Sequence, residues 1–449
     1  MRIVTWQKPR AQAGSRISFS GRLPPKRSAG VTQAARESST ALYVARQPIL
    51  DEQGRVFGYE LLYRGAPGDT TCAVKSDLAS ASVITSAMLD LGLDTLTGGH
   101  RAFLNVTGSL VIEQIDALVP PDDVVLELLE TIEVTDELIA ACRKLKAKGY
   151  VLALDDFVAG SSAEALLPYV SFVKVDVLNT PMPQVTELAK RLKPLGVTML
   201  AEKVENRDVY EQTLEAGYAL FQGYYFCRPV IQMGAAIPAH QLVYVRLLAA
   251  LSKPDLTMSE LEALVKQDVS LSLRVLRFVN SAAVPIRTEV GSIRQALLLI
   301  GIEPIRKWAS VWCLAGLNPG STPELTTLAL VRARSCELIG EKSRLLDASE
   351  LFVVGLFSLL DVLLSRTMAD ALDNLPLPPS TAAALLGRDN KERSVLDAVI
   401  AYENGEWDDA SRAAVSAGVN SDELPTAYTT ALRWAQDISR SGISAPRSA

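Results

Sequence analysis

Residues 41 to 233 alternate between short apolar runs and amphipathic stretches, and this alternation constrains the fold more than any other feature. The apolar runs have the length of strands, and the stretches between them have helical spacing. A strand–helix–strand order repeated about seven times is typical of a parallel sheet, and the missing Gly-rich phosphate fingerprint favours a β/α barrel over a dinucleotide-binding sheet. The expected strands cover residues 42–50, 56–64, 101–107, 124–130, 151–157, 172–177, 198–204 and 218–226.

The connections between these strands have recognisable signals. The first two strands flank the turn sequence Asp51-Glu52-Gln53-Gly54, which predicts a hairpin. Helical periodicity predicts helices at residues 74–93, 136–149 and 184–196.

The run VLALDDF, residues 151–157, ends in two adjacent aspartates with no lysine or arginine beside them. Burying a bare carboxylate costs several kcal/mol, so we expect a cation or an opening to solvent near Asp155 and Asp156. Taken alone, the pair is explained more simply as a strand end at which Asp156 caps the next helix.

Nearly every expected strand has a polar or charged residue near its carboxyl end. So many costly buried groups on separate strands are difficult to explain as core packing, and a barrel carries its working residues at these ends. Oxygen ligands without histidine or cysteine suit Mg²⁺, Mn²⁺ or Ca²⁺, as phosphodiester hydrolysis requires. The side chains are Glu60, Asn105, Glu127, Glu130, Asp155, Asp156, Lys174, Asp176, Glu202, Glu205 and Gln222.

Seven ordered motifs resemble those of the EAL domain, a β/α barrel that binds cyclic di-GMP in bacteria. When active, this domain hydrolyses the nucleotide to linear pGpG. The motifs are GYELLYR, LNVTGS, LELLE, ALDDF, VKVDV, AEKVE and QGYYF.

The resemblance implies a role for each matching residue. Catalytic roles fall to Lys174, near the attacking water, and to Glu202, as general base. Arg64 and Gln222 match substrate-binding residues. The metal ligands, for Mg²⁺ or Mn²⁺, are Glu60, Asn105, Glu127, Asp155 and Asp156.

Three departures from the EAL pattern count against catalysis. Val158 stands where a glycine normally lets the loop fold over the metal site, and we expect it to change the loop path because a β-branched residue rarely adopts positive φ. Lys203 replaces the glycine of AEGVE, and Leu129 replaces a threonine. Two interpretations stay open: a metal-dependent phosphodiesterase, and an inactive barrel that senses the nucleotide or serves as a scaffold for protein partners.

Residues 235–440 lack the strand-like apolar runs, and their helical periodicity predicts an all-α domain. The strings LRVLRFVNSA, residues 273–282, and IRQALLLIG, residues 293–301, resemble the HDOD domain, a helical module similar to HD-type metal phosphohydrolases. Such hydrolases need several histidines, whereas this chain has only His100 and His240. We therefore expect a non-catalytic domain that binds an unidentified protein partner.

Composition limits the remaining possibilities. Residues 1–40 hold eight Lys and Arg against one acid, and we expect this segment to be disordered. Its net charge is +7. Because the whole chain has a net charge of −6, the other 409 residues have a net charge of −13. An acidic body argues against nucleic acid as the main partner. The basic segment also fits a transit peptide, a misassigned start, or an attachment to membrane or nucleic acid.

Cysteine usage and hydropathy indicate the compartment. Five scattered cysteines indicate a reducing cytoplasm. The longest apolar run, residues 351–364, is too short to span a membrane and contains Asp361, so it predicts a buried helix. A homodimer is compatible with this composition.

Overall fold

The computed structural model describes residues 43–64, 92–223 except 114, 244–280 except 246, 249, 252 and 254, 290–317, 323–364 except 344 and 345, and 366–438 except 374 and 376. The basic segment 1–40 and the helix expected at 74–93 lie outside these residues, apart from the last two positions of that helix. No helix among the described residues is both long enough and apolar enough to cross a membrane.

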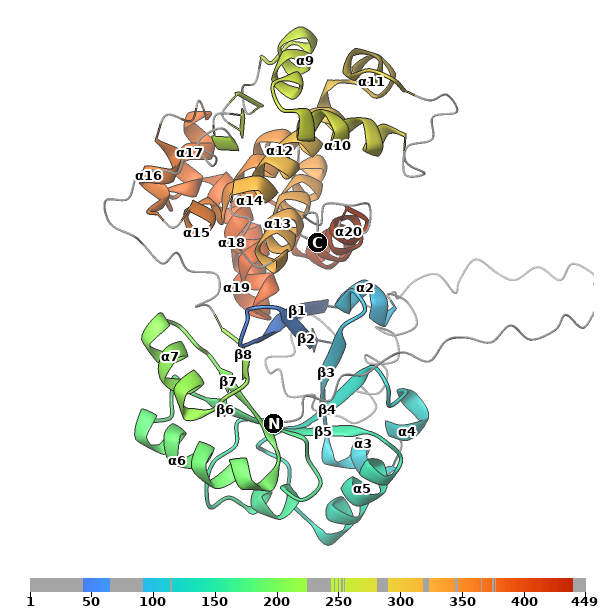
Figure 1. Cartoon of the computed structure of the whole chain (residues 1–449), viewed down its shortest axis with the longest axis vertical. Helices are drawn as coiled ribbons and strands as arrows, with labels where there is room; N and C mark the ends of the chain where they lie inside the picture. Colours follow the sequence, from blue (N-terminus) through green and yellow to red (C-terminus); the bar gives the residue numbers. More distant parts are fainter. Residues whose placement is uncertain are drawn as a thin grey trace, which may run out of the picture. The chain divides into compact units, whose positions relative to one another are not determined.

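The first part of the chain is a closed eight-stranded barrel, as predicted (Figure 1). The first strand pairs antiparallel with its two neighbours, the second and the eighth, and all other pairs are parallel. The predicted hairpin is confirmed. The strands are β1 (Tyr43–Asp51), β2 (Val56–Arg64), β3 (Arg101–Val106), β4 (Val124–Leu128), β5 (Val151–Leu154), β6 (Phe172–Asp176), β7 (Thr198–Glu202) and β8 (Leu220–Phe221).

An apolar layer fills the interior of the barrel and fixes which residues reach its mouth. Successive side chains on a strand point to opposite faces, so the residue two positions beyond an interior residue also points inward. Phe103 is followed in this way by Asn105, and Phe172 by Lys174. The interior layer consists of Ile49, Phe103, Val125, Ala153, Phe172, Leu200 and Leu220.

Gly58 leaves the space that this layer needs on β2. A Cβ at Gly58 would lie 2.8 Å from the Arg101 carbonyl oxygen and 2.9 Å from the Phe103 ring. The missing side chain lets Phe103 pack into the barrel interior, and Glu60, two positions on, points to the mouth.

Short helices connect the parallel strands. The 136–149 helix is confirmed, with Thr135 accepting a hydrogen bond from the Leu138 amide as N-cap. The described helices of the barrel are α2 (Leu93–Thr97), α3 (Gly108–Glu113), α4 (Ile115–Leu118), α5 (Asp136–Ala147), η2 (Ser162–Leu166), α6 (Met182–Leu192), η3 (Lys193–Leu195) and α7 (Arg207–Ala216).

The second part of the chain is helical, as predicted. The apolar run 351–364 is buried, but it forms two helices instead of one. The described helices are α9 (Met258–Lys266), α10 (Val269–Val279), α11 (Ile293–Ile300), α12 (Ile302–Leu317), α13 (Pro323–Lys342), α14 (Ala348–Phe357), α15 (Leu360–Leu364), α16 (Met368–Leu372), α17 (Pro379–Leu385), α18 (Lys391–Glu403), α19 (Trp407–Ala417), η5 (Ser421–Glu423) and α20 (Leu424–Ile438).

Helix α13 packs closely against α14 because Gly355 carries no side chain. A Cβ at Gly355 would lie 2.5 Å from the Arg332 carbonyl oxygen and 2.6 Å from Ala333 atoms. At the same level, Arg332 forms a buried ion pair with Glu403, with Nε 2.8 Å from Oε2. This contact joins α13 to the end of α18.

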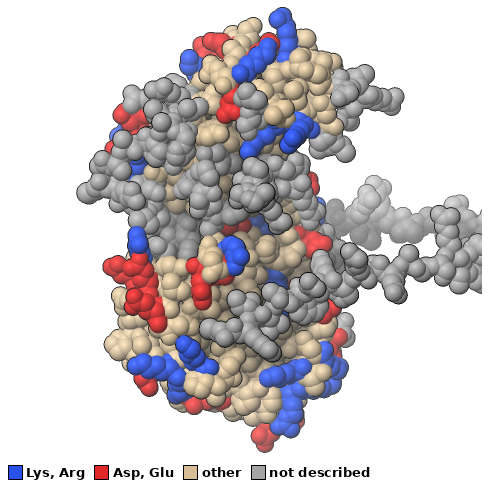
Figure 2. Space-filling view, viewed as in Figure 1, with Lys and Arg blue, Asp and Glu red and all other residues tan. Residues whose placement is uncertain are grey.

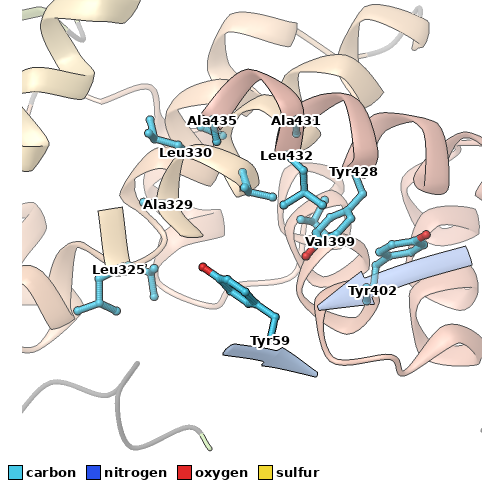
Figure 3. Close-up of a cluster of buried hydrophobic side chains, with 14 of the residues drawn as sticks. Tyr59, Leu325, Ala329, Leu330, Val399, Tyr402, Tyr428, Ala431, Leu432 and Ala435 are labelled. Atoms are coloured by element: carbon cyan, nitrogen blue, oxygen red, sulfur yellow. The ribbon is translucent and has the colours of Figure 1, made fainter. Parts of the chain in front are cut away.

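Helices of the second part cover the outer face of the β1–β2 hairpin. Two strands joined by a tight turn have no crossover helix between them, so their outer face needs another cover. Figure 3 shows Tyr59 of β2 among side chains of α13, α18 and α20, and ring contacts join Tyr43 of β1 to Tyr402 and Trp407. The helical part therefore completes the packing of the barrel.

A buried polar network lies within this apolar contact. Tyr59 donates a hydrogen bond of 2.6 Å to Glu324, and Arg46 lies 3.6 Å from the same carboxylate with its guanidinium 4.1 Å above the Tyr59 ring. Tyr402 accepts a hydrogen bond from the Val44 amide. Burial raises the pKa of Glu324, and the Arg46 charge opposes that rise.

On the face in Figure 2, Lys and Arg side chains are interspersed with Asp and Glu over the barrel. A nucleic-acid surface would show a continuous basic stripe. The described residues on this face carry both charges, and the expectation that nucleic acid is not the main partner stays a prediction.

The substitution Tyr59→Phe tests the polar network. It removes the hydroxyl donor and leaves the Glu324 carboxylate buried with Arg46 as its remaining partner. We expect the free energy of unfolding in urea to fall by about 1–3 kcal/mol. The control is Tyr169→Phe, whose hydroxyl accepts a hydrogen bond from Arg143 in an exposed position; equal losses in both variants would contradict a role for the buried network.

Candidate functional site

The mouth of the barrel is organised around one buried ammonium group. Lys174 projects from β6, and its Nζ lies 2.8 Å from carboxylate oxygens of Asp155 and Glu202, 2.9 Å from Glu127 and 3.3 Å from Glu60. The Lys174 residue is fully buried. Glu60, Glu127 and Glu202 lie on β2, β4 and β7, and Asp155 directly follows β5, so only the closed barrel brings the four carboxylates together.

Burial and charge together set the protonation of this cluster. Burial lowers the pKa of Lys174, but the four carboxylates outweigh it and raise that pKa well above the ordinary value. Burial raises the pKa of Glu127 well above its usual range, against the Lys174 charge. Burial likewise raises the pKa of Glu202 to about 8. The cluster holds a firmly charged lysine beside carboxyls that ionise reluctantly.

Glu60 is the exception among these acids. Burial works to raise its pKa, but the Lys174 charge and hydrogen bonds from Gln222, Lys174 and Asn105 outweigh it and lower the pKa. Asn105 Nδ2 donates to Glu60 Oε1 at 3.2 Å, and Gln222 Nε2 donates to Oε2 at 2.8 Å. Glu60 is therefore held as a carboxylate.

Gln47 belongs to the same network, and we did not predict it from the sequence. Its Oε1 accepts a hydrogen bond of 2.7 Å from Gln222, and its Nε2 lies 3.4 Å from the Asn404 carbonyl oxygen in the helical part. The signal was available: β1 runs antiparallel, so the inward residue nearest the mouth comes two positions before Ile49 instead of after it.

Asp156 lies at the outer edge of the cluster with an unusual backbone. Its φ is +41°, and aspartate tolerates this region better than most residues. Its side chain does not cap the next helix, because the N-cap of η2 is Ser161. The simpler interpretation of the Asp155–Asp156 pair as a cap is therefore wrong.

Val158 does not obstruct the site. It is 64% exposed, and it is not among the described residues with positive φ. The positive φ angles of this turn fall at Asp156 and Gly160, in keeping with the reluctance of a β-branched residue to adopt them. The altered loop path that we expect from Val158 stays a prediction.

Other predicted residues lie further out or cannot be placed. Glu130 is exposed beyond the end of β4. Arg64 is the last residue of β2, and its side chain is outside the described part of the structure. Asp176 ends β6 and pairs with Lys203, with Nζ 2.5 Å from Oδ2.

The oxygens of this site fit a hard cation by their chemistry. Buried oxygens without a hydrogen-bond donor among the described residues include Asn105 Oδ1, both carboxylate oxygens of Glu127, Asp156 Oδ1 and Gln222 Oε1. Glu127 Oε1 is close to Lys174 but lacks the alignment of a hydrogen bond. Such orphaned oxygens suit Mg²⁺, Mn²⁺ or Ca²⁺.

As the side chains stand, Lys174 takes the centre that an ion would use. Within the described ranges, no three His, Cys, Asp or Glu side chains form a group that could hold a metal. A divalent ion would have to displace the Lys174 ammonium from part of its carboxylate set.

Family models and relatives agree on the two-part organisation. The EAL domain model matches residues 32–229 and the HDOD domain model matches residues 237–376. YuxH of Bacillus subtilis, an uncharacterized protein, is 33% identical over 405 residues, which cover 88% of this chain and 98% of YuxH. The chain belongs to the EAL–HDOD proteins. The resemblance of each half is thereby confirmed.

Two further proteins extend the comparison. CdgJ of Vibrio cholerae, named a cyclic di-GMP phosphodiesterase, is 32% identical over 422 residues, or 93% of this EAL–HDOD chain and 97% of CdgJ. The structure of Klebsiella pneumoniae BlrP1 in a manganese and cy-diGMP complex is 26% identical, covering 41% of this chain and 55% of that one with a TM-score of 0.35.

The raised pKa of Glu202 gives a testable pH dependence. Between the unfolded pKa near 4.5 and the folded value of about 8, native Glu202 keeps a proton that the unfolded chain releases. Stability therefore falls as pH rises through this window, by up to about 1.4 kcal/mol per pH unit. In urea unfolding with EDTA, Glu202→Gln should lose less stability from pH 5 to pH 8 than the unchanged protein.

The matched control for this measurement is Glu187→Gln, which changes an exposed carboxyl on α6. It should follow the unchanged protein. Identical pH profiles for the Glu202 and Glu187 variants would show that Glu202 is already ionised at low pH.

Gly223 positions Gln222 and gives a second prediction. A Cβ at Gly223 would lie 2.4 Å from the Val204 nitrogen and 2.5 Å from its oxygen, and the Gly223 φ is +145°. Gly223→Ala should separate the ends of β7 and β8 and lower the melting temperature. Gly196→Ala is the control, because its φ is +76° but a Cβ there meets nothing within 4 Å; an equal loss in both would mean that the φ angle, not the close approach, matters.

Proposed function

We propose that this EAL–HDOD protein binds cyclic di-GMP at the barrel mouth and hydrolyses one phosphodiester bond to give pGpG. The observation that supports this most is the convergence of Glu60, Asn105, Glu127, Asp155 and Glu202 on one buried cluster around Lys174. Core packing gives no reason for so many polar groups in one place.

The residues that would hold the divalent ion are Glu60, Asn105, Glu127 and Asp155, with Asp156 beside a second ion. A Mg²⁺ or Mn²⁺ ion neutralises phosphate charge and makes water more acidic. The donor set consists of oxygens alone, several of them buried without a donor, which supports this assignment.

Protein groups would supply the proton transfer and charge stabilisation. A carboxyl with a pKa near the working pH is suited to take the proton of an attacking water, and Glu202, at about 8, has this property. The Lys174 ammonium would stabilise negative charge that develops on the phosphate. Arg64, at the end of β2, would contact the phosphate of the nucleotide.

The name of CdgJ supports the same reaction. CdgJ matches this chain over nearly its whole length, HDOD half included. The HDOD half would act as a non-catalytic interaction domain, because a histidine-rich metal set is lacking from its described residues.

A second function is a nucleotide sensor without turnover. It is favoured by Lys174 at the centre of the acid cluster and by Lys203, which stands at a glycine position of the EAL pattern. Both ammonium groups compete with the ions that hydrolysis requires.

Calorimetric titration with cyclic di-GMP, with and without Mg²⁺, followed by product analysis of the same samples, separates the two functions. We expect binding and Mg²⁺-dependent pGpG formation. Glu202→Ala and Glu60→Ala should lower turnover about 100-fold or more, and Glu187→Ala should not. Binding without any product would favour the sensor, and absence of binding would contradict both.

A further inference from the structure

Lys203 occupies a backbone conformation that lysine rarely adopts. It directly follows Glu202 at the end of β7, and its φ is +56°. Among the described non-glycine residues, only Asp156 shares this property. Glycine adopts a left-handed conformation without the steric cost that a residue with a Cβ meets, so lysine is not the residue that the backbone favours at this position.

The Lys203 side chain is directed at the acids of the barrel mouth. Its Nζ lies 2.5 Å from Asp176 Oδ2. Asp176 is itself held by the backbone amides of Leu178 and Asn179 and by the Asn179 side chain. The ammonium is thus paired with a carboxylate that is fixed in place.

The charges of two further acids also act on this ammonium. Burial lowers the pKa of Lys203, but its hydrogen bond to Asp176 and the charges of Asp156, Asp176 and Glu202 outweigh this and raise it. Asp156 keeps one buried oxygen without a hydrogen-bond donor in the described structure. Lys203 is therefore paired with Asp176 of β6 and lies within the electrostatic influence of acids at the ends of β5 and β7.

A simple surface ion pair explains this arrangement poorly. The Lys203 side chain is 49% exposed, and exposed ion pairs contribute little to stability, so this pair does not by itself compensate for the unfavourable φ angle. The location of the Lys203 charge is more informative than the energy of the ion pair. The charge lies at the edge where Asp156 would receive a second ion under the proposed function.

We infer that Lys203 is a built-in counter-ion for the Asp156–Asp176 edge, so that this protein binds one divalent ion tightly and a second only weakly. This inference rests on the proposed function. The tight ion takes the Glu60, Asn105, Glu127 and Asp155 oxygens, and an ion at Asp156 has to compete with the lysine.

Mn²⁺ titration of the full-length protein, followed by the electron paramagnetic resonance signal of free Mn²⁺, tests the inference without nucleotide. We expect the unchanged protein to bind one ion tightly. Lys203→Met, which removes the charge and keeps the length, should bind a second ion at least 10-fold more tightly than the unchanged protein. Lys203→Arg, which keeps the charge, should behave as the unchanged protein does.

The matched control is Lys190→Met, on the exposed side of α6. It should leave both binding steps unaltered. Circular dichroism checks the fold of each variant, and Lys203→Gly, which also removes the φ cost, replaces Lys203→Met if that variant does not fold.

The outcomes separate this inference from the proposed function. Equal Mn²⁺ binding by the unchanged protein and the Lys203→Met and Lys203→Gly variants would overturn the inference and leave the phosphodiesterase proposal intact. A second tight ion in the variants, in a protein that makes no pGpG, would support the inference and contradict the phosphodiesterase. No Mn²⁺ binding by any form would overturn both.

Discussion

The buried ammonium of Lys174 is the interaction on which the mouth of this barrel depends. Four carboxyl groups from separate strands can meet in a dry interior only if protons or a positive charge between them offset their mutual repulsion. Lys174 supplies that charge with distances of 2.8–3.3 Å. Under the proposed function, a divalent ion would have to compete with this ammonium for the same carboxylates.

Buried side-chain contacts, and not only the continuous chain, connect the barrel to the helical part. The hairpin β1–β2 carries Glu60 and Gln47 on its inner face and Arg46 and Tyr59 on its outer face. A shift of either strand would displace the side chains on both of its faces, because inward-pointing and outward-pointing side chains alternate along one backbone. The helices that cover this hairpin are therefore well placed to sense or influence the site.

Two lysines divide the acidic mouth into an inner and an outer set. Lys174 is paired with the inner carboxylates, and Lys203 is paired with Asp176. Orphaned oxygens are concentrated in the inner set, at Glu127 and Asn105, which is where a hard cation gains most. Under the inference drawn above, this asymmetry would make the two metal positions unequal.

The sequence by itself determined the barrel, its hairpin, the helical second half and the polar strand ends, because these follow from local periodicity of two and 3.6 residues. It also identified Val158 and Lys203 as departures from a family pattern. Only the tertiary structure decided that Lys174 lies at the centre of the acids, that Gln47 joins them and that Val158 stays exposed. Those outcomes depend on strand order, closure and backbone angles at turns, which bring together residues more than a hundred positions apart and which no local pattern encodes.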